Sequence, residues 1–314
     1  MRLIFCGTPQ FAVPTLEALI ARRFTIDLVV TNPDEPSGRS YGLKPPPVKV
    51  AAERVGLSIF QPTSLKDAET QAFISKCRPD AIVVVAYGHL IPPWMIDLPP
   101  LGCINLHASL LPKYRGAAPI AWALIHGERV TGVTTMKIDA GLDTGDVLLK
   151  RETEIRDDDT TETLAARLSG IGAELMVETL ERLKRGEIVP QPQDHSQATL
   201  APRLKKEDGR INWSLTAEEI ARRVRGLQPW PGAYTTFRGR NLRLWVAAPV
   251  TTESPRSLDP GTVTASGDRL LVACGEGTAL EVRELQLEGR KRMSARDFLN
   301  GVRVRELEKF GSAS

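Results

Sequence analysis

The stretch GCINLHASLLPKYRGAAPIAWAL, residues 102–124, decides the fold that this sequence predicts. It opens with an apolar run, Cys103–Leu106, that is typical of a buried strand, and a proline-containing loop follows His107. Residues two apart on a strand point to the same face, so Asn105 and His107 are expected side by side. Open α/β sheets bind ligands at the carboxyl ends of their strands, and this pair is expected at such an end.

A second segment, IDAGLDTGD at residues 138–146, supplies a carboxylate, Asp143. A carboxylate beside His107 could hold the imidazole in one tautomer or keep it protonated. Acyl chemistry suits the side chains of Asn105, His107 and Asp143. Two of them can stabilise a developing oxyanion, and the third can act as a general acid or base. We therefore interpret these three residues as a candidate catalytic site.

The sequence around these segments alternates between short β-branched runs and helical patterns. Strands are expected at residues 2–6, 26–31, 81–86, 103–106 and 133–138, and helices at residues 11–22, 48–55, 67–77, 119–126 and 160–184. This alternation predicts an α/β fold, with a Rossmann-like, mostly parallel sheet and helices on both faces. The continuously apolar runs AIVVVAY and LVVT agree with strands that are covered on both faces.

Residues 186–209 break this pattern, since three prolines punctuate a polar stretch without a clear period, and they are the best candidate for a linker. Beyond them, the sequence predicts a helix at 216–225 and strands at 233–237, 242–246, 261–265, 269–273 and 280–285. Many short strands separated by glycine and proline predict a small barrel. Two domains are therefore expected, at residues 1–203 and 204–314. Trp213 and Trp230 are expected in the barrel core or at an interface.

The composition is that of an ordinary globular protein, with 42% apolar and 25% charged residues. Four scattered cysteines without a C-x-x-C pair indicate a reducing compartment rather than a disulfide framework. The N-terminal MRLIFCGTP is typical of a first strand rather than a signal peptide, and no apolar stretch reaches membrane-spanning length. A cytoplasmic protein without a membrane partner is therefore expected.

The net charge of +3 is unevenly distributed. Residues 1–203 hold 22 basic and 24 acidic side chains, for a charge of −2, whereas residues 204–314 hold 19 and 14, for +5. A basic C-terminal third is a modest indication of a polyanionic partner, although an ordinary solvated surface has the same signature.

Two motifs resemble a known family. The segment N-x-H-x-S-L-L-P-x-x-R-G at residues 105–116, followed by GLDTGD at 141–146, resembles the formyltransferases that use 10-formyltetrahydrofolate. Further stretches are similar to the family members that act on methionyl initiator tRNA: IFCGTPQFA (4–12), NPDEPSGR (32–39), PPPVKVAA (45–52), VVVAYGHLIP (83–92), INWSLTAEEI (211–220), GLQPWPGA (226–233) and MSARDFL (293–299). The resemblance therefore covers the whole chain.

The resemblance implies transfer of a formyl group from the co-substrate 10-formyltetrahydrofolate to the α-amino group of methionine on charged initiator tRNA, for translation initiation. For this reaction we assign Asn105 and protonated His107 to the oxyanion, and Asp143 to keeping His107 protonated and to relaying the proton of the attacking amine, without a metal. The residues that would line the folate site are Ser109, Leu110, Leu111, Pro112, Tyr87 and Gly88. The C-terminal barrel is expected to be OB-like and to bind tRNA, and the enzyme is expected to be a monomer.

The connection from Asn32 to Lys49 is long for a βα loop. In the resembled family this loop wedges against the end of the tRNA acceptor stem. Arg39 and Lys44 would contact phosphates there, and Tyr41 could stack on an exposed base. The chain departs from close relatives here, because Ser40 and Tyr41 follow Gly38-Arg39 where those relatives tend to have two lysines.

Two other enzyme classes fit the same three residues. A hydrolase would release formate from the folate with water in place of the amine, although such enzymes usually carry a regulatory extension, whereas the first strand here is expected at residue 2. A formyltransferase could also act on a small amine, but it would not require a basic barrel. The turn GTPQF has one glycine, which disfavours an NAD enzyme. Zinc at Cys103 and His107 lacks a third ligand, and Ser109 lacks the G-x-S-x-G elbow of a nucleophile.

Overall fold

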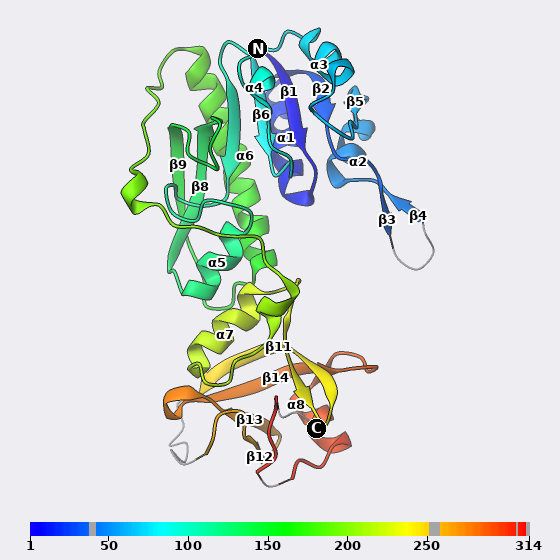
Figure 1. The fold of residues 1–314 in the computed structure, drawn as a ribbon, viewed down its shortest axis with the longest axis vertical. Coiled ribbons are helices and arrows are strands. Elements are labelled where there is room, and N and C mark those ends of the chain that lie inside the picture. The colour runs from blue at the N-terminus through cyan, green and yellow to red at the C-terminus, as the bar shows by residue number, and fades with distance from the viewer. Residues whose placement is uncertain (38–41, 251–257, 306, 312–314) are drawn as a thin grey trace. The chain divides into compact units, whose positions relative to one another are not determined.

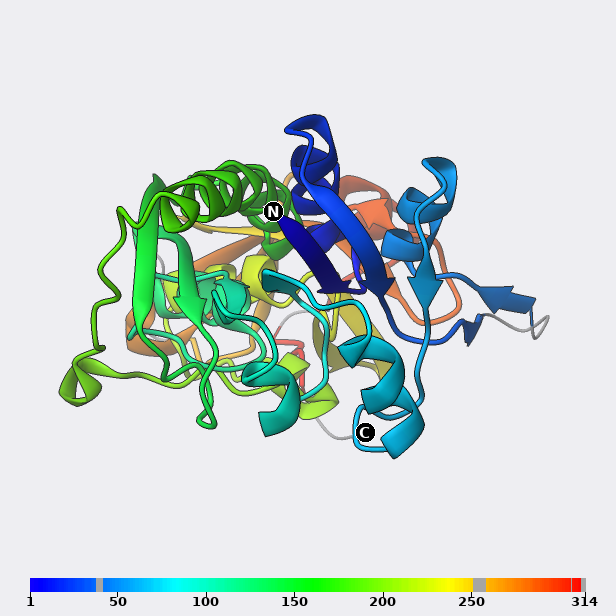
Figure 2. The ribbon, with the colours of Figure 1, turned by 90° about the horizontal axis from the view of Figure 1, so that it is seen from above.

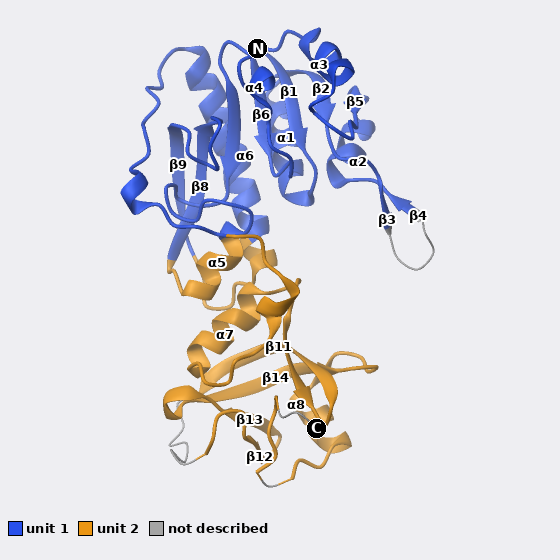
Figure 3. Cartoon of the chain, in the orientation of Figure 1, with its two compact units in different colours: residues 1–119, 130–154, 165–201 blue, residues 120–129, 155–164, 202–314 orange. Residues whose placement is uncertain are grey.

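The computed structural model describes residues 1–37, 42–250, 258–305 and 307–311 of the chain. These residues form two compact units, which Figure 3 colours separately. The first unit comprises residues 1–119, 130–154 and 165–201, and the second unit comprises residues 120–129, 155–164 and 202–314. The segments 120–129 and 155–164 thus group with the second unit, which the expected division at residue 203 did not include. The assignment of catalysis to one part and tRNA binding to the other stays a prediction.

The first unit contains a seven-stranded sheet with the order β5-β2-β1-β6-β7-β8-β9 (Figure 1). Its strands are β1 Arg2–Gly7, β2 Thr25–Val30, β5 Ile59–Phe60, β6 Ala81–Val85, β7 Cys103–His107, β8 Val130–Lys137 and β9 Val147–Glu154. From β5 to β7 the neighbouring strands are parallel, whereas β8 is antiparallel to both β7 and β9. The predicted α/β fold with a mostly parallel sheet is confirmed.

The edge strand β9 was not predicted from the sequence. Its first two residues are buried, and the rest alternate between half-buried and exposed side chains. This pattern arises because β9 is the last strand of the sheet and presents one face to solvent. Because β9 contains many charged residues, no continuous apolar run marks it as a strand in the sequence.

Helices cover both faces of this sheet. They are α1 Val13–Ala21, α2 Pro47–Arg54, α3 Ala68–Ser75, α4 Pro93–Ile96 and α6 Thr161–Lys184, with a 3-10 turn η1 at Gln10–Ala12. On one face, Ile74 of α3 and Met95 of α4 are buried together with Ile4, Ile82 and Cys103 of the strands. Apolar side chains thus point to both faces of the central strands, which is why their sequences are continuously apolar.

On the opposite face, α6 packs against β7. A Cβ added to Gly172 of α6 would come within 2.5 Å of the Leu106 Cδ2, so the glycine allows a close approach of helix and strand. The Thr135 hydroxyl of β8 also lies 2.8 Å from the Thr179 hydroxyl of α6, and Figure 2 shows α6 along one side of β8 and β9. Because Leu106 points toward α6, its neighbours on β7 point away from that helix.

The long loop after β2 carries a short hairpin, β3 Glu35–Ser37 and β4 Gly42–Lys44. Residues 38–41 lie outside the described residues, so the expected tRNA contacts at Arg39 and Tyr41 have no structural description. Lys44 is described and lies at the end of β4.

The second unit contains an antiparallel sheet with the order β10-β11-β14-β13-β12, and β15 pairs with β14. Its strands are β10 Ala233–Phe237, β11 Arg240–Val250, β12 Val263–Ser266, β13 Arg269–Ala273, β14 Ala279–Leu287 and β15 Met293–Ser294, and its helices include α5 Pro119–His126, α7 Ala217–Gly226 and α8 Ala295–Gly301.

The helix α7 begins in a capping box, in which Thr216 and Glu219 satisfy each other's backbone N–H groups. The sequence predicted a small OB-like barrel in this part of the chain, and the second β domain is confirmed as an antiparallel sheet. β10 and β12 are the first and last strands of this path, and both are paired further: Tyr234 of β10 bridges to Arg210, and the Val263 N–H of β12 donates to the Glu308 carbonyl at 2.7 Å.

The expectation of two buried tryptophans holds for one of them. Trp213 is buried, its Nε1 donates to the Thr235 hydroxyl at 3.2 Å, and its ring lies 5.9 Å from that of Phe310. Trp230 is 55% exposed, so the expectation was wrong for this residue. Trp230 lies in the turn between α7 and β10.

The expected linker is partly built into the first unit. The backbone of Gln191 pairs with Val147 at the start of β9, and Leu200 bridges to Arg115 in the loop after β7. Backbone hydrogen bonds therefore anchor residues 191–201, although their sequence has no regular period. This anchoring brings the segment beside the candidate site.

Candidate active site

The strand β7 presents Asn105 and His107 on the same face, as the two-residue period of a strand requires. Pairing with β8 places Asn105 opposite Met136 and His107 opposite Thr134. His107 is buried, and Asn105 is half-buried. Within the described residues, the Asn105 carboxamide makes no hydrogen bond to another side chain or to the backbone, so its N–H groups are available to a ligand.

Two contacts define the environment of the His107 imidazole. Its Nε2 lies 2.9 Å from the carbonyl oxygen of Tyr114. Because a carbonyl oxygen can only accept, this contact places a proton on Nε2. Its Nδ1 lies 3.6 Å from the Asp143 Oδ2, slightly beyond hydrogen-bond length. The backbone at Tyr114 therefore sets the proton on one ring nitrogen, and Asp143 faces the other.

The Asp143 loop, residues 138–146, connects β8 to β9 and folds back along β7. It leaves β8 beside the start of β7, where the Ile138 N–H donates to the Cys103 carbonyl at 2.8 Å. Asp143 then reaches His107 at the far end of β7, and its Oδ2 accepts from the Gly116 N–H at 2.8 Å. Its φ of +52° is a left-handed conformation, which costs an L-residue roughly 1–2 kcal/mol. Neighbouring groups must therefore hold the loop in this shape.

The loop after β7 is tied by its own hydrogen bonds. The Ser109 hydroxyl donates to the Lys113 carbonyl at 2.6 Å, so it is not directed at His107 as a nucleophile would be. The Thr134 hydroxyl donates to the Ser109 carbonyl at 2.7 Å and accepts from the Leu111 N–H at 3.2 Å. The Lys150 ammonium donates to the Leu111 carbonyl, and burial lowers its pKa. These contacts fix the backbone that carries Tyr114 to the imidazole.

The six residues expected to line a folate site differ in their accessibility. Tyr87, Ser109 and Leu111 are buried, whereas Gly88, Leu110 and Pro112 are exposed or half-buried. The Tyr87 ring is part of the core beneath the sheet, and its burial raises the pKa of the phenol. A ligand could therefore touch the accessible three directly, while the buried three shape the backbone behind them.

Comparison with known proteins identifies the family. A family model described as formyl transferase matches residues 1–180, and a model of the formyl transferase C-terminal domain matches residues 203–303. The chain belongs to the formyl transferase family.

Relatives within the formyl transferase family match the full chain. A methionyl-tRNA formyltransferase from Koribacter versatilis is 56% identical over 315 residues, with 100% of both chains covered. One from Solibacter usitatus is 55% identical, with 99% of both chains covered. The solved structure of methionyl-tRNA formyltransferase from Clostridium thermocellum matches with a TM-score of 0.57 and 20% identity, over 88% of this chain and 100% of that chain. The structural match supports the fold.

Two residues beside the Asp143 loop of this formyl transferase were not predicted from the sequence. Arg115 and Gln193 are 6% and 7% exposed, and they hydrogen-bond to each other. Arg115 stands within the family motif, which is a signal that could have singled it out. Gln193 lies in the expected linker, where no local pattern marks it.

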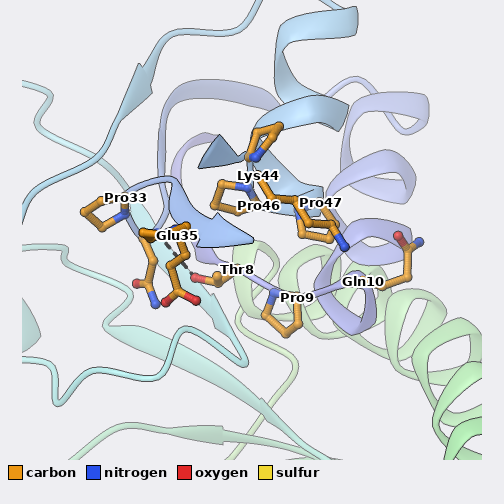
Figure 4. A pocket seen from close by; sticks show the side chains of 11 residues that line it. Thr8, Pro9, Gln10, Pro33, Glu35, Lys44, Pro46 and Pro47 are labelled. Atoms are coloured by element: carbon orange, nitrogen blue, oxygen red, sulfur yellow. Dashed lines mark hydrogen bonds between the residues drawn. The ribbon is translucent and has the colours of Figure 1, made fainter. Parts of the chain in front are cut away.

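A cavity of about 340 Å³ lies at the carboxyl ends of β1 and β2. Figure 4 shows Thr8 and Pro9 on one side of it, and Pro46, Pro47 and Lys44 on another. The prolines make its walls apolar and stiff. In the same wall, Asn32 Oδ1 is a buried acceptor that has no hydrogen-bond partner among the residues that the structure describes. The expected tRNA contact Lys44 is thus a cation at the rim of an apolar cavity.

The described residues contain no group of three or more His, Cys, Asp or Glu side chains that could hold a metal ion. Cys103, which shares a strand face with His107, donates its thiol to the Met95 carbonyl at 3.2 Å, and burial raises its pKa to about 12. The four cysteines are free thiols. No helix in the described part of the chain is long and apolar enough to cross a membrane.

Proposed function

We propose that this enzyme transfers the formyl group of 10-formyltetrahydrofolate to the α-amino group of methionine on charged initiator tRNA. The observation that carries the proposal is the convergence of Asn105, His107 and Asp143, within a chain that matches methionyl-tRNA formyltransferases over its full length. Asn105 and His107 come from one strand face, and Asp143 comes from a loop that reaches back to the imidazole.

The carbonyl oxygen of the formyl group gains negative charge when the amine attacks. We assign the stabilisation of this charge to the Asn105 carboxamide, which has N–H groups to donate, and to His107 protonated on Nδ1. The hydrogen bond from Nε2 to Tyr114 orients the ring, so that Nδ1 presents its proton without reorganisation.

The amine must lose a proton before the tetrahedral intermediate can collapse. We assign its acceptance to Asp143, whose Oδ2 is held by the Gly116 N–H while its Oδ1 makes no hydrogen bond to a described residue. Return of a proton to the departing folate nitrogen then makes it a neutral leaving group. The carboxylate therefore acts first as the general base. Once it has gained the proton of the amine, the carboxylic acid can act as the general acid.

Exposed apolar side chains beside the site support a flat ligand. Leu90 is 84% exposed in the loop that follows β6, and Leu142 is 56% exposed next to Asp143. Both loops border β7 and its catalytic residues. We propose that the folate ring system covers these two side chains, together with the accessible Gly88, Leu110 and Pro112.

Asn105→Ala is expected to lower the single-turnover rate of formyl transfer roughly 100-fold, which is the contribution of one oxyanion donor. Asn105→Asp is the matched variant, because it keeps the size of the side chain and replaces the donor by an oxygen that repels the oxyanion. Its loss should be at least as large. Folate affinity, measured by titration of a non-reactive analogue, should stay within about twofold of the parent. A parent-like rate in Asn105→Ala would contradict the assignment.

Lys44→Ala is expected to weaken the binding of charged tRNA and to reduce its salt dependence by about one unit of log–log slope, because one phosphate contact is lost. Titration of tRNA at several salt concentrations gives the slope. The exposed Lys66 of the first unit provides the matched control, and Lys66→Ala should keep the parent slope. An unchanged slope in Lys44→Ala would assign the contact to other residues.

One assay separates the proposed reaction from its two rivals. The enzyme is given the formyl donor with charged initiator tRNA, with free methionine, or with water alone. The proposal is supported if the charged tRNA is formylated while free methionine and water do not react. Release of formate at the same rate without any amine would identify a hydrolase, and efficient formylation of the free amine would identify a small-amine formyltransferase.

A further inference from the structure

Gln193 uses its whole carboxamide to join two parts of the site. Its Nε2 donates to the backbone carbonyls of Asp143 and Gly145, at 2.9 and 2.7 Å. Its Oε1 accepts from Nε and Nη2 of Arg115, at 3.2 and 2.7 Å. Two donated and two accepted hydrogen bonds saturate the amide. The side chain therefore links Arg115 directly to the backbone of the Asp143 loop.

These partners leave only one orientation for the amide. A guanidinium can only donate and a peptide carbonyl can only accept, so exchange of Oε1 and Nε2 would oppose like groups at all four contacts. Gln193 is also buried, which makes an unmade hydrogen bond costly. The carboxamide is thus a rigid connector rather than an adaptable surface group.

Arg115 anchors the other end of this connector. Its backbone N–H donates to the Thr199 carbonyl at 2.9 Å, and its carbonyl accepts from the Ala201 N–H at 2.7 Å. Its Nη2 also donates to the Nδ1 of His195 at 3.2 Å. The next residue, Gly116, has a φ of +119°, and a Cβ there would come within 2.7 Å of the Ala201 carbonyl oxygen. Residues 193–201 therefore form one framework with the loop after β7.

The Asp143 loop needs such a framework. Asp143 has a left-handed backbone, and its carboxylate must stay near the His107 Nδ1. The Gly116 N–H holds the carboxylate, and Gln193 holds the backbone at Asp143 and two residues later, at Gly145. Both restraints start from the adjacent residues Arg115 and Gly116. Arg115 hydrogen-bonds to Gln193, and the Gly116 N–H donates to the Asp143 carboxylate.

We propose that Gln193 is a positioning residue for catalysis, which sets the place of the Asp143 carboxylate by clamping the carbonyls of its loop. This inference rests on the catalytic role proposed above for Asp143. Through this one side chain, a stretch with the composition of a linker takes an indirect part in the reaction. Gln193 itself touches neither His107 nor the reacting groups and acts through the loop.

Gln193→Glu tests the clamp with almost no change in volume. The glutamate keeps an oxygen for Arg115 and strengthens that contact by its charge, but it turns a second oxygen toward the carbonyls of Asp143 and Gly145. An anchoring role toward Arg115 alone predicts a parent-like enzyme. Positioning of Asp143 predicts a 10- to 100-fold slower single-turnover formyl transfer, of the order that a displacement of about 1 Å causes, with the affinities for folate analogue and charged tRNA within about twofold.

Gln193→Ala removes both halves of the clamp, and Gln191→Ala is its matched control. Gln191 lies in the same segment, but among the described residues its exposed side chain donates only to the Val189 carbonyl, at 3.1 Å. Gln193→Ala should show the same loss in rate, whereas Gln191→Ala should keep the parent rate. Thermal unfolding of each variant establishes that the measured protein is folded.

A double-mutant cycle with Asp143→Asn completes the test. If Gln193 acts through Asp143, Gln193→Ala should cost less than about twofold in the Asp143→Asn background, measured over long single-turnover time courses. A full-sized further loss in that background, a parent-like rate in Gln193→Glu, or a loss confined to substrate affinity would each overturn the inference. A parent-like rate in Asp143→Asn alone would instead refute the proposed catalytic role and remove the basis of the inference.

Discussion

Asp143→Asn is expected to slow formyl transfer by roughly 10³- to 10⁴-fold, at the upper end of what a positioned acid–base group contributes. The amide keeps the size of the side chain, and its oxygen can still accept from the Gly116 N–H, so the loop should keep its shape. What is lost is a group that accepts the proton of the amine and the negative charge that faces the His107 Nδ1 at 3.6 Å. Single-turnover assays with saturating folate and charged tRNA measure the chemical step.

The binding of a folate analogue should remain close to normal in Asp143→Asn, because the carboxylate acts on protons rather than on the ring system. Asp97→Asn offers a matched control, since it removes an exposed carboxylate elsewhere in the first unit. This control should retain the parent rate. A turnover of Asp143→Asn near that of the parent would show that another group takes the amine proton.

His107→Ala is expected to lower the same rate by about 10³-fold. The change removes a proposed donor to the oxyanion, and it also removes the partner that Asp143 faces. The Tyr114 carbonyl loses its hydrogen bond, so part of the effect could come from a displaced loop. His107→Asn addresses this point, because its shorter amide retains donors near β7 while it lacks a group that can become a cation.

Both histidine variants should therefore transfer the formyl group slowly. Each should also show a cooperative thermal unfolding transition, which establishes that it is folded. Combining His107→Ala with Asp143→Asn should cost far less than the product of the two single losses, since residues that act as a unit are not additive. A fully multiplicative loss would indicate that the two side chains contribute independently. A fast His107→Asn enzyme would mean that a neutral donor suffices and that the imidazolium has no special part.

Local sequence patterns predicted the strand that carries the site. The alternation of Cys103, Asn105 and His107 with apolar neighbours placed the two polar side chains on one face, and β7 has this arrangement. The helix α5 was expected and is found at residues 119–126. Such features depend on the period of a single element, which is written in contiguous residues. Their roles in catalysis were predicted from a motif and stay predictions until the variants above are measured.

Local sequence patterns gave wrong or missing predictions where the burial of a residue depends on contacts with distant parts of the chain. The edge strand β9 resembles a polar segment because only part of it is covered, and Trp230 is exposed although aromatic rings of its size are usually buried. In both cases the sequence states the chemistry of the side chain but not which other elements lie beside it.

The sequence by itself determined the alternation of strands and helices, the shared face of Asn105 and His107, and the identity of the carboxylate that could serve them. Only the tertiary structure decided that the Asp143 loop folds back along β7, that the Tyr114 carbonyl fixes a proton of the imidazole, and that Gln193 clamps the loop from 50 residues away in the chain. The physical reason is that the first group follows from backbone periods within one element. The second group consists of hydrogen bonds to backbone atoms, which every residue possesses and which therefore leave no mark in the order of side chains.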